Sequence, residues 1–447
     1  MDRRRFTYLT ATGLAGAGMA GLGRPRAHLA AASTQELRVD GTRLNDRLQA
    51  LARIGRNPGG GNGRVAFSDA DLEARAWYGS LLEEAGFATR VDVAGNLWGR
   101  REGTEAGRAP LALGSHLDSV PDGGHYDGPV GSVGALEVAW TLADADHATR
   151  HPVEVVVFPN EEGGKTGSRA LAGEVEPFEL DIETASGFTI GEGIRRIGGN
   201  PDQLADARLH PGDLAAFLEL HVEQGAVLET DGMDIGVVEG IVGIMRWDVV
   251  VEGDTNHAGT TPMPRRRDAL VAAARFVDTV HTTALEMPGR QVATVGRIEA
   301  EPGAPNVIPG RVRLTLEIRD LSMDGISRVY DRLVEQAEAL GDATETTFSF
   351  SRFYVSGAAP TDPALRDAVE SSAEELAFST LRMPSGAGHD AQSIATFAPV
   401  GMIFVPSRDG ISHAPEEFTS AEDVTRGTDV LLRTLLQADA MEWGPPR

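Results

Sequence analysis

Four short clusters of histidine and carboxylate residues each follow an apolar run in this sequence. The first is the run Gly114–Ser119, which contains His116 and Asp118 and is followed by Tyr126-Asp127-Gly128. The apolar residues Leu111–Leu113 before it predict a buried strand that ends at the histidine. In α/β proteins, side chains at strand ends commonly form binding sites. A histidine and an aspartate placed there suit a borderline divalent cation such as zinc, although a single pair of this kind is more often merely solvated.

The other three clusters repeat this arrangement further along the chain. They are Asn160–Gly163, Glu219–Gly225, and Ser412–Glu417, the last preceded by Ser385–Asp390. The adjacent carboxylates Glu161 and Glu162 point in different directions, so that one can bind a metal while the other faces a substrate water. Alternation along the strand predicts that Glu219, His221 and Glu223 share one side of an extended segment. Together the clusters predict a metal site built from imidazole and carboxylate groups.

Composition narrows the possible chemistry. The chain has 447 residues, of which 41% are hydrophobic and 24% charged, as is ordinary for a globular protein of two or three domains. The net charge of −25 argues against nucleic acid as a partner, because phosphate binding needs a basic face. The absence of cysteine excludes disulfides, thiolate metal ligands and a cysteine nucleophile.

Residues 1–33 have the pattern of an export signal. Arg3-Arg4-Arg5-Phe6 precedes a mildly apolar region from Leu9 to Leu22, and Ala30-Ala31-Ala32 provides small residues for cleavage. This pattern predicts export by the twin-arginine route to the periplasm or the outside of the cell. The alternative is an uncleaved tail on a cytoplasmic enzyme. The apolar region is short and rich in glycine, so we expect no stable membrane anchor.

The elements around the first clusters predict a mostly parallel sheet. Leucines at positions 44, 48 and 51 and the segment Ser68–Glu84 have helical periodicity. Further along, strands and a helix alternate, and the strands are nearly continuous apolar runs. These segments are Ala88–Val93, Asn96–Gly99 and Val153–Phe158 for strands and Val133–Leu142 for the helix. This alternation favours an α/β domain whose sheet is covered on both faces.

From about Gly240 the pattern changes to the order β-α-β-β-α-β, which is typical of a ferredoxin-like α+β unit. The predicted elements are Arg246–Glu252, Arg266–His281, Val292–Glu299, Arg311–Asp320, Asp324–Leu340 and Thr346–Tyr354. From Gly357 onward helix and strand alternate again. We therefore predict a catalytic α/β domain formed by residues 34–240 and 357–447, interrupted by an inserted domain at residues 241–356.

The sequence resembles the M20-type metallopeptidase superfamily, in its hydantoinase/carbamoylase branch of N-carbamoyl-L-amino-acid hydrolases, allantoate amidohydrolases and yeast-type β-ureidopropionases. The resemblance runs from about Leu44 to Leu436. It rests on the motifs GSHLDSVPDGGHYDG, NEEG, GSRALAG, ELHVEQG, HAGTTPMPRRRDA, PNVIPG, EIRD, SGAGHDA and SHAPEE. The HVEQG and HAGTTPM elements favour this branch over the peptidases.

The resemblance implies a site for two divalent metal ions per subunit, with zinc first and manganese, cobalt or nickel as alternatives. One ion would be held by two histidines, the other by a histidine and a glutamate, and an aspartate would bridge them. The implied ligands are, in that order, His116 and His221, His413 and Glu162, and Asp127. Glu161 would be the general base, and Asp118 would orient His116.

The resemblance also implies how the substrate is recognised. The implied binding residues are Arg319 and Asn306 for a carboxylate, Gln224 for the polar end, His257 for the oxyanion, and Gly386 and Ala387 with His389 nearby. The inserted domain would act as a lid and pair with its copy in a homodimer. The implied reaction is hydrolysis of a linear ureido acid of the N-carbamoyl-L-amino acid or allantoate type, with release of ammonia and carbon dioxide.

Two other functions stay open at this point. An exopeptidase or aminoacylase of the same superfamily would cleave an ordinary amide instead. An exported binding protein would keep the fold without catalysis, yet Glu161 and all the implied ligands are present. The chain also departs from its relatives after NEEG, where they commonly carry a basic–aromatic pair and this chain has Gly163-Gly164-Lys165-Thr166. This difference places the shape of the substrate pocket in question.

Overall fold

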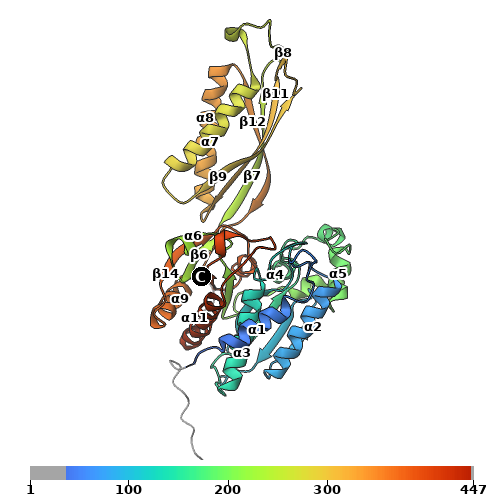
Figure 1. The fold of residues 1–447 in the computed structure, drawn as a ribbon, viewed down its shortest axis with the longest axis vertical. Coiled ribbons are helices and arrows are strands. Elements are labelled where there is room, and N and C mark those ends of the chain that lie inside the picture. The colour runs from blue at the N-terminus through green and yellow to red at the C-terminus, as the bar shows by residue number, and fades with distance from the viewer. Residues whose placement is uncertain (1–36, 444–447) are drawn as a thin grey trace, which may run out of the picture.

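The structure is a computed structural model that describes residues 37–443 (Figure 1). The predicted export signal at residues 1–33 lies outside the described residues. The described chain has a broad lower part and an elongated upper part (Figure 1). Within residues 37–443, no helix combines the length and the apolar character that crossing a membrane requires.

The lower part is built on one mixed sheet. Its strand order is β1-β2-β4-β3-β5-β15-β6-β13, and β14 also pairs with β6. The central pairs β4–β3, β3–β5 and β5–β15 are parallel, which confirms the predicted α/β class. The strands are β1 Ala88–Val91, β2 Leu97–Arg101, β3 Leu111–His116, β4 Val153–Phe158, β5 Ala216–Val222, β6 Ile235–Ile241, β13 Ala359–Pro360, β14 Thr380–Ser385 and β15 Val400–Val405.

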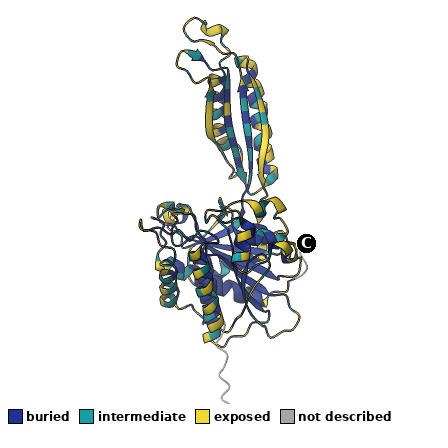
Figure 2. Cartoon of the chain, turned by 90° about the vertical axis from the view of Figure 1, so that its right-hand side faces the viewer, coloured by how far each residue is buried: buried dark blue, intermediate teal, exposed yellow. Residues whose placement is uncertain are grey.

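Helices cover both faces of this sheet, and Figure 2 shows the sheet as the buried centre of the lower part. The helices α1, α2, α3, α9 and α11 pack on one face, while α4 and α10 belong to the core on the other. The helices are α1 Gly41–Leu51, α2 Asp69–Glu84, α3 Pro129–Asp144, α4 Thr166–Ala172, α5 Ile190–Arg196, α6 Val227–Asp231, α9 Pro363–Glu375, α10 Asp390–Ile394 and α11 Ala421–Ala440. Every residue of β3, β4, β5 and β15 is buried, which explains their continuous apolar sequences.

The upper part is a separate four-stranded antiparallel sheet with the strand order β12-β7-β11-β9. Two helices pack against it, and together they enclose a core of their own. Alternate residues of β7 are buried, as expected for a sheet with one covered face. The elements are β7 Gly243–Glu252, β8 Asn256–His257, α7 Ala269–Glu286, β9 Val292–Glu301, β10 Val307–Ile308, β11 Arg311–Asp320, α8 Met323–Thr344 and β12 Thr347–Ser356.

The chain passes between the two sheets twice, and both passages are short. β6 ends at Ile241 and β7 begins at Gly243, while β12 ends at Ser356 and β13 begins at Ala359. Figure 1 shows the narrow junction that results between the two parts. We refer to residues 243–356 as the lid. Its function as a lid and the domain boundaries at 241 and 356 stay predictions.

Candidate active site

The parallel strands of the lower sheet bring the predicted clusters to one edge. β3 ends at His116, β4 is followed by Pro159–Glu162, and β5 ends next to His221. The loop after β15 carries His413, whose backbone adopts a left-handed conformation with φ of 57°. Because the carboxyl ends of parallel strands share an edge, residues far apart in the sequence converge there.

Asp127 lies at the centre of this convergence. Its Oδ1 atom is 3.2 Å from His221 Nε2 and 3.7 Å from His116 Nε2. Its Oδ2 atom is 3.3 Å from Nε2 of His413, which in turn is 3.4 Å from Glu162 Oε2. The structure therefore brings all five implied ligands together around one carboxylate.

These ligand atoms form two groups that share Asp127. In each group, of His116, Asp127 and His221 and of Asp127, Glu162 and His413, the candidate ligand atoms lie within 4.8 Å of one another. Nitrogen and oxygen donors at such spacing suit a divalent cation of the zinc, manganese, cobalt or nickel kind. The shared aspartate is the geometry expected of a bridging carboxylate between two neighbouring ions.

Backbone carbonyl groups fix the orientation of two of the imidazole rings. Nδ1 of His116 donates to the carbonyl oxygen of Asp118, and Nδ1 of His221 donates to that of Val222, both at 2.9 Å. Since a carbonyl only accepts hydrogen bonds, each Nδ1 carries the proton. Each Nε2 atom therefore faces Asp127 and is the nitrogen that can bind a metal once it has lost any proton it carries.

The Asp118 carboxylate has a different partner from the one implied by the resemblance. Its two oxygens accept hydrogen bonds from the backbone N–H groups of Glu161 and Glu162, both at 3.3 Å. Its carboxylate is 3.9 Å from His116 Nδ1, so the close contact to the imidazole comes from its carbonyl group. The carboxylate of Asp118 thus holds the turn that carries the two adjacent glutamates.

Glu161 lies beside the ligands. Its Oε2 atom is 3.8 Å from His116 Nε2. Burial raises the pKa of its carboxyl well above the usual range, and the nearby carboxylates of Asp390 and Glu162 raise it further. A carboxylate with increased proton affinity at this place is suited to accept a proton from a water molecule.

Three polar residues hold Asp127 in place, and two of them were not predicted to have a role. Gln224 Nε2 donates to Asp127 Oδ2 at 2.6 Å, and the Ser412 hydroxyl donates to the same oxygen at 2.7 Å. The buried carboxylate of Glu417 accepts from the backbone N–H groups of Tyr126 and Asp127 at 2.8 and 3.0 Å. Ser412 and Glu417 lie within the SHAPEE motif, but nothing in that motif shows that Glu417 contacts a loop 290 residues away. Gln224 Oε1 is buried without a partner and can accept an N–H from a substrate.

The remaining members of the clusters take other positions. Ser385 Oγ lies 2.8 Å from Nε2 of His389, which is buried with its ring 4.4 Å from that of His221. Glu223 does not face the metal ligands; its carboxylate accepts from the first backbone N–H groups of α6. The expected alignment of Glu219, His221 and Glu223 is therefore incomplete, because β5 ends at Val222.

Charges in the metal-free site are strongly coupled through Asp127. Burial lowers the pKa of His221, but the hydrogen bond to Asp127 outweighs it and raises the pKa to about 9. The hydrogen bond to Asp127 likewise raises the pKa of His413 to about 9. Burial and the neighbouring His221 lower the pKa of His116 to about 4. In the absence of metal, two of the three imidazoles are therefore protonated at neutral pH.

This arrangement predicts that metal binding near pH 7 releases about three protons, because metal ions bind neutral imidazole and ionised carboxylate. Two come from His221 and His413, and the third comes from Glu162, whose pKa is raised to about 8 by burial and by the neighbouring Asp127. The release should decline as the pH rises through 8 and 9, where these groups have already lost their protons. The ion pairs of His221 and His413 with Asp127 also stabilise the metal-free fold. Their contribution to the free energy of unfolding is complete below pH 6.5 and is lost as the pH rises through about 9. Calorimetry in buffers of different ionisation enthalpy measures the protons released. A release that does not change between pH 7 and 9.5 would contradict the prediction.

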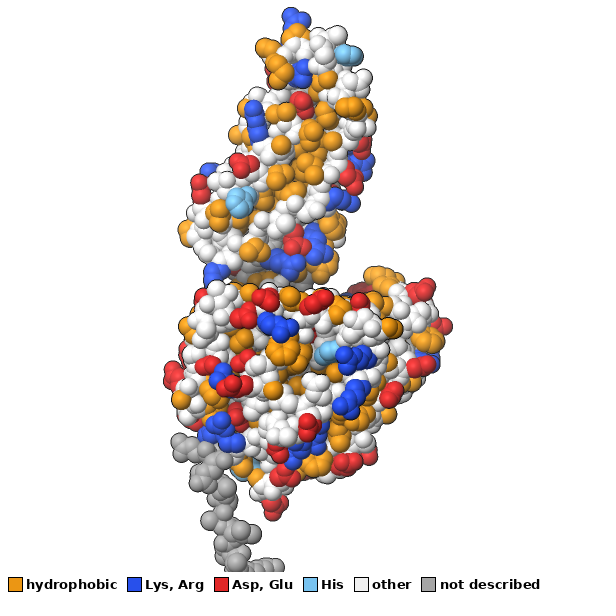
Figure 3. All heavy atoms as spheres, viewed as in Figure 1, with side chains coloured by type: hydrophobic (Ala, Val, Ile, Leu, Met, Phe, Trp, Pro, Cys, Tyr) orange, Lys and Arg blue, Asp and Glu red, His pale blue; other side chains and the backbone are white. Residues whose placement is uncertain are grey.

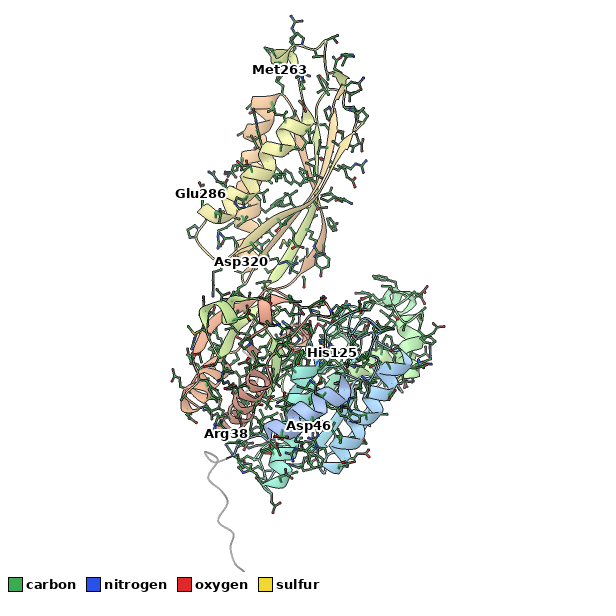
Figure 4. The ribbon with its side chains drawn as sticks, viewed as in Figure 1. Arg38, Asp46, His125, Met263, Glu286 and Asp320 are labelled. Carbon is green, nitrogen blue, oxygen red and sulfur yellow. The ribbon has the colours of Figure 1, made fainter. Side chains whose placement is uncertain are left out.

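Part of the implied substrate-binding set lies at the junction of the two parts. Arg319 Nη1 donates to the carbonyl oxygen of Gly386 at 2.6 Å, and Arg319 Nε donates to Glu317 at 2.7 Å. The backbone N–H of Ala387 donates to Ser385 Oγ in the same loop. The neighbouring Asp320 is labelled at the lower end of the lid in Figure 4. Arg319 is thus close to the loop that carries Gly386 and Ala387.

The other two implied residues lie at the far end of the lid. His257 is in β8, which pairs with β10, and the backbone N–H of Ala258 donates to the carbonyl oxygen of Asn306. Figure 1 shows β8 at the end of the lid opposite the junction, and Figure 4 labels Met263, six residues after His257, at the same end. Within one chain the structure does not bring His257 and Asn306 to the metal ligands.

Comparison with known proteins agrees with this fold. Residues 112–437 match the model of peptidase family M20/M25/M40, and the chain belongs to this family. An N-carbamoyl-L-amino acid amidohydrolase of Geobacillus stearothermophilus is 38% identical over 89% of this chain and 98% of its own. An allantoate amidohydrolase of Bacillus subtilis is 33% identical over 87% of this chain and 95% of its own.

Solved structures also resemble this chain over most of its length. A hydantoinase/carbamoylase family amidase from Burkholderia multivorans has 37% sequence identity and a TM-score of 0.83, over 91% of this chain and 99% of its own. A protein from Burkholderia cenocepacia described as a putative amidohydrolase/peptidase has 39% identity and a TM-score of 0.85, over 91% of this chain and its full length. The relatives from Geobacillus and Bacillus are thus named as amidohydrolases, the first of N-carbamoyl-L-amino acids and the second of allantoate.

Proposed function

We propose that this protein is a metal-dependent amidohydrolase that cleaves the carbon–nitrogen bond of a linear ureido acid and releases ammonia and carbon dioxide. The observation that carries the proposal is the pair of ligand groups joined by Asp127, with Glu161 beside them. The names of the relatives support ureido substrates over ordinary amides. The alternative of an exopeptidase or aminoacylase is not favoured by them.

The proposed cofactor is two divalent ions per subunit, and the residues fit it. Every donor is an imidazole nitrogen or a carboxylate oxygen, and each group provides three of them with Asp127 in common. Such donors accept zinc, and also manganese, cobalt or nickel. Bound there, the ions would supply Lewis acidity that polarises the scissile carbonyl and makes water acidic enough to react near neutral pH.

The residues of the chain would perform the other steps. Glu161 takes a proton from the attacking water and passes it to the leaving nitrogen, whose bond to the carbonyl carbon then breaks. Gln224 Oε1 accepts a hydrogen bond from an N–H group of the substrate. Arg319 binds the substrate carboxylate with its planar guanidinium group, after exchanging its present contact with Gly386 for the substrate.

We also propose a homodimer that pairs through the lid. Two observations support it: His257 and Asn306 lie at the far end of the lid, and the lid exposes large apolar side chains. These side chains include Leu270, Val271 and Leu285 of α7 and Val292 and Ile298 of β9. Figure 3 shows hydrophobic side chains along the visible face of the lid. In such a dimer, His257 would stabilise the oxyanion in the site of the other subunit.

The cellular location is proposed from the leader alone. Arg3-Arg4-Arg5-Phe6 and the following apolar segment support export by the twin-arginine route. Fractionation of cells that express the full chain or its Arg3→Lys/Arg4→Lys variant tests this. Equal amounts of both proteins outside the cytoplasmic fraction would contradict the proposal.

A substrate panel tests the reaction. The metal-loaded protein would be given N-carbamoyl-L-amino acids, allantoate and N-carbamoyl-β-alanine, with N-acetyl amino acids and dipeptides as comparison amides. We expect ammonia from at least one ureido acid, and loss of this activity after the metal is removed by a chelator. Turnover of the acetylated or peptide substrates alone would overturn the proposal.

A further inference from the structure

Lys165 is the only lysine of the chain, and it closes the turn that carries Glu161. Its backbone N–H donates to the Glu161 carbonyl oxygen at 2.9 Å. The Lys165 backbone has a φ of 57°, a left-handed conformation that glycine adopts freely and that strains other residues. A lysine in this conformation points to a use for its side chain.

The side chain of Lys165 reaches the opposite wall of the site. Its ammonium group donates a hydrogen bond to Oε1 of Gln392 in α10. Among the described residues 37–443 this ammonium group forms no direct ion pair, and the nearby carboxyl groups of Glu161 and Asp390 act on its charge from a greater distance. A Cβ atom placed on Gly388 would be 3.4 Å from Nζ, so the ammonium also lies against the loop before α10. Its direct partner is therefore a neutral amide.

Gln392 continues the connection to the lid. Its Nε2 atom donates to the Gly357 carbonyl oxygen at 2.7 Å and to Ser356 Oγ at 3.2 Å. Ser356 is the last residue of β12, so these contacts fall on the passage by which the chain returns from the lid. The other passage contacts the same region, because Val242 N donates to the Ser385 carbonyl oxygen at 3.0 Å.

We propose that Lys165 and Gln392 are positioning residues that couple the orientation of the lid to the placement of Glu161. The connection runs from the Glu161 turn through the ammonium group and the amide to the returning passage at Ser356 and Gly357. It rests on the proposed function in one respect, which is that Glu161 is the general base. A movement of the lid that displaces Gly357 would also displace the turn that carries Glu161. Substrate binding at the lid would therefore bring Glu161 into its catalytic position.

The test uses Lys165→Gly and Gln392→Leu, singly and together. Because glycine accepts the left-handed backbone, Lys165→Gly should keep the melting temperature near that of the unchanged protein while the side-chain link is lost. We expect each single variant to lower kcat about tenfold with unchanged metal content, since small displacements of a catalytic group reduce rates by such factors. The double variant should be no slower than either single variant, because both break one connection.

The matched control variant is Gln437→Leu. Gln437 is a half-buried glutamine whose amide oxygen accepts from Ser371 at 3.0 Å, between α9 and α11. Gln437→Leu removes a similar side-chain link away from the junction and should leave kcat unchanged. Additive losses in the double variant, or an equal loss in Gln437→Leu, would overturn the proposal.

Hydrogen exchange of the metal-loaded protein provides a readout that needs no substrate. Gln392→Leu should increase exchange both in residues 160–166 and in residues 354–360, and Lys165→Gly should increase it in residues 354–360 as well. Exchange that changes only next to each substitution would overturn the coupling. If no ureido acid is turned over, the proposed function fails, while the exchange experiment still decides the coupling.

Discussion

Replacing Glu161 with glutamine should lower kcat roughly 10³-fold and leave the bound metal unchanged. Glutamine has the same shape but cannot accept the proton of the attacking water. The five residues that fit the metals are untouched, so metal content should stay at the level of the unchanged protein. Steady-state kinetics and elemental analysis of the same sample would measure both quantities.

Two further variants serve as controls for Glu161→Gln. Glu183→Gln changes an exposed carboxylate that lines the cavity beside Glu162 and should keep kcat within about twofold. Asp127→Asn weakens the shared ligand and should lose metal as well as activity. If Glu161→Gln loses its metal too, or keeps its activity, Glu161 is not a base acting beside an intact metal centre.

Mixing two inactive variants should restore activity if the lid of one chain serves the site of another. Co-expressed Glu161→Gln and His257→Ala chains form heterodimers in which one site has both its own Glu161 and the His257 of the partner. With random pairing, about a quarter of the wild-type activity should return. The position of His257 at the far end of the lid is the reason for this expectation.

The matched control combines Glu161→Gln with the double variant Glu161→Gln/His257→Ala, a pair in which no chain carries the base. This mixture should stay inactive, which excludes contamination as the source of activity. Absence of recovery in the first mixture, with heterodimers present, would show that His257 does not act between subunits.

The convergence of the five candidate ligands could be predicted from the sequence, because each lies at the end of a strand of the mixed sheet or in the loop that follows one. His116 is the last residue of β3 and His221 is the last but one of β5, and these two strands end at the same edge of the sheet. The same reasoning does not extend to His257, because no local pattern encodes the distance between the far end of the lid and the site. The observed helix ends also differ from the predicted ones. The predicted helix Val133–Leu142 is the middle of α3, which begins at Pro129. Proline is well tolerated in the first turn of a helix.

Contacts between side chains far apart in the sequence were beyond prediction. Glu417 stabilises the loop of Asp127 through backbone N–H groups, and only the folded chain shows that the two segments are neighbours. Lys165 and Gln392 are 227 positions apart, and each belongs to a short segment whose own sequence fits many conformations. The backbone of a parallel sheet follows from apolar patterns, whereas polar contacts between loops depend on the complete fold.

The proposed lid motion would turn about an axis through the two short passages between the sheets. The lid strands have ten residues and extend about 33 Å from this axis, at about 3.3 Å per residue. A rotation of about 20° would therefore carry the far end of the lid through roughly 11 Å, while groups near the axis, such as Arg319, would move by only a fraction of that. In the proposed lid motion the lid would therefore act as a lever, and small adjustments of the substrate near the axis would become large displacements of the end that the proposed dimer presents to its second subunit.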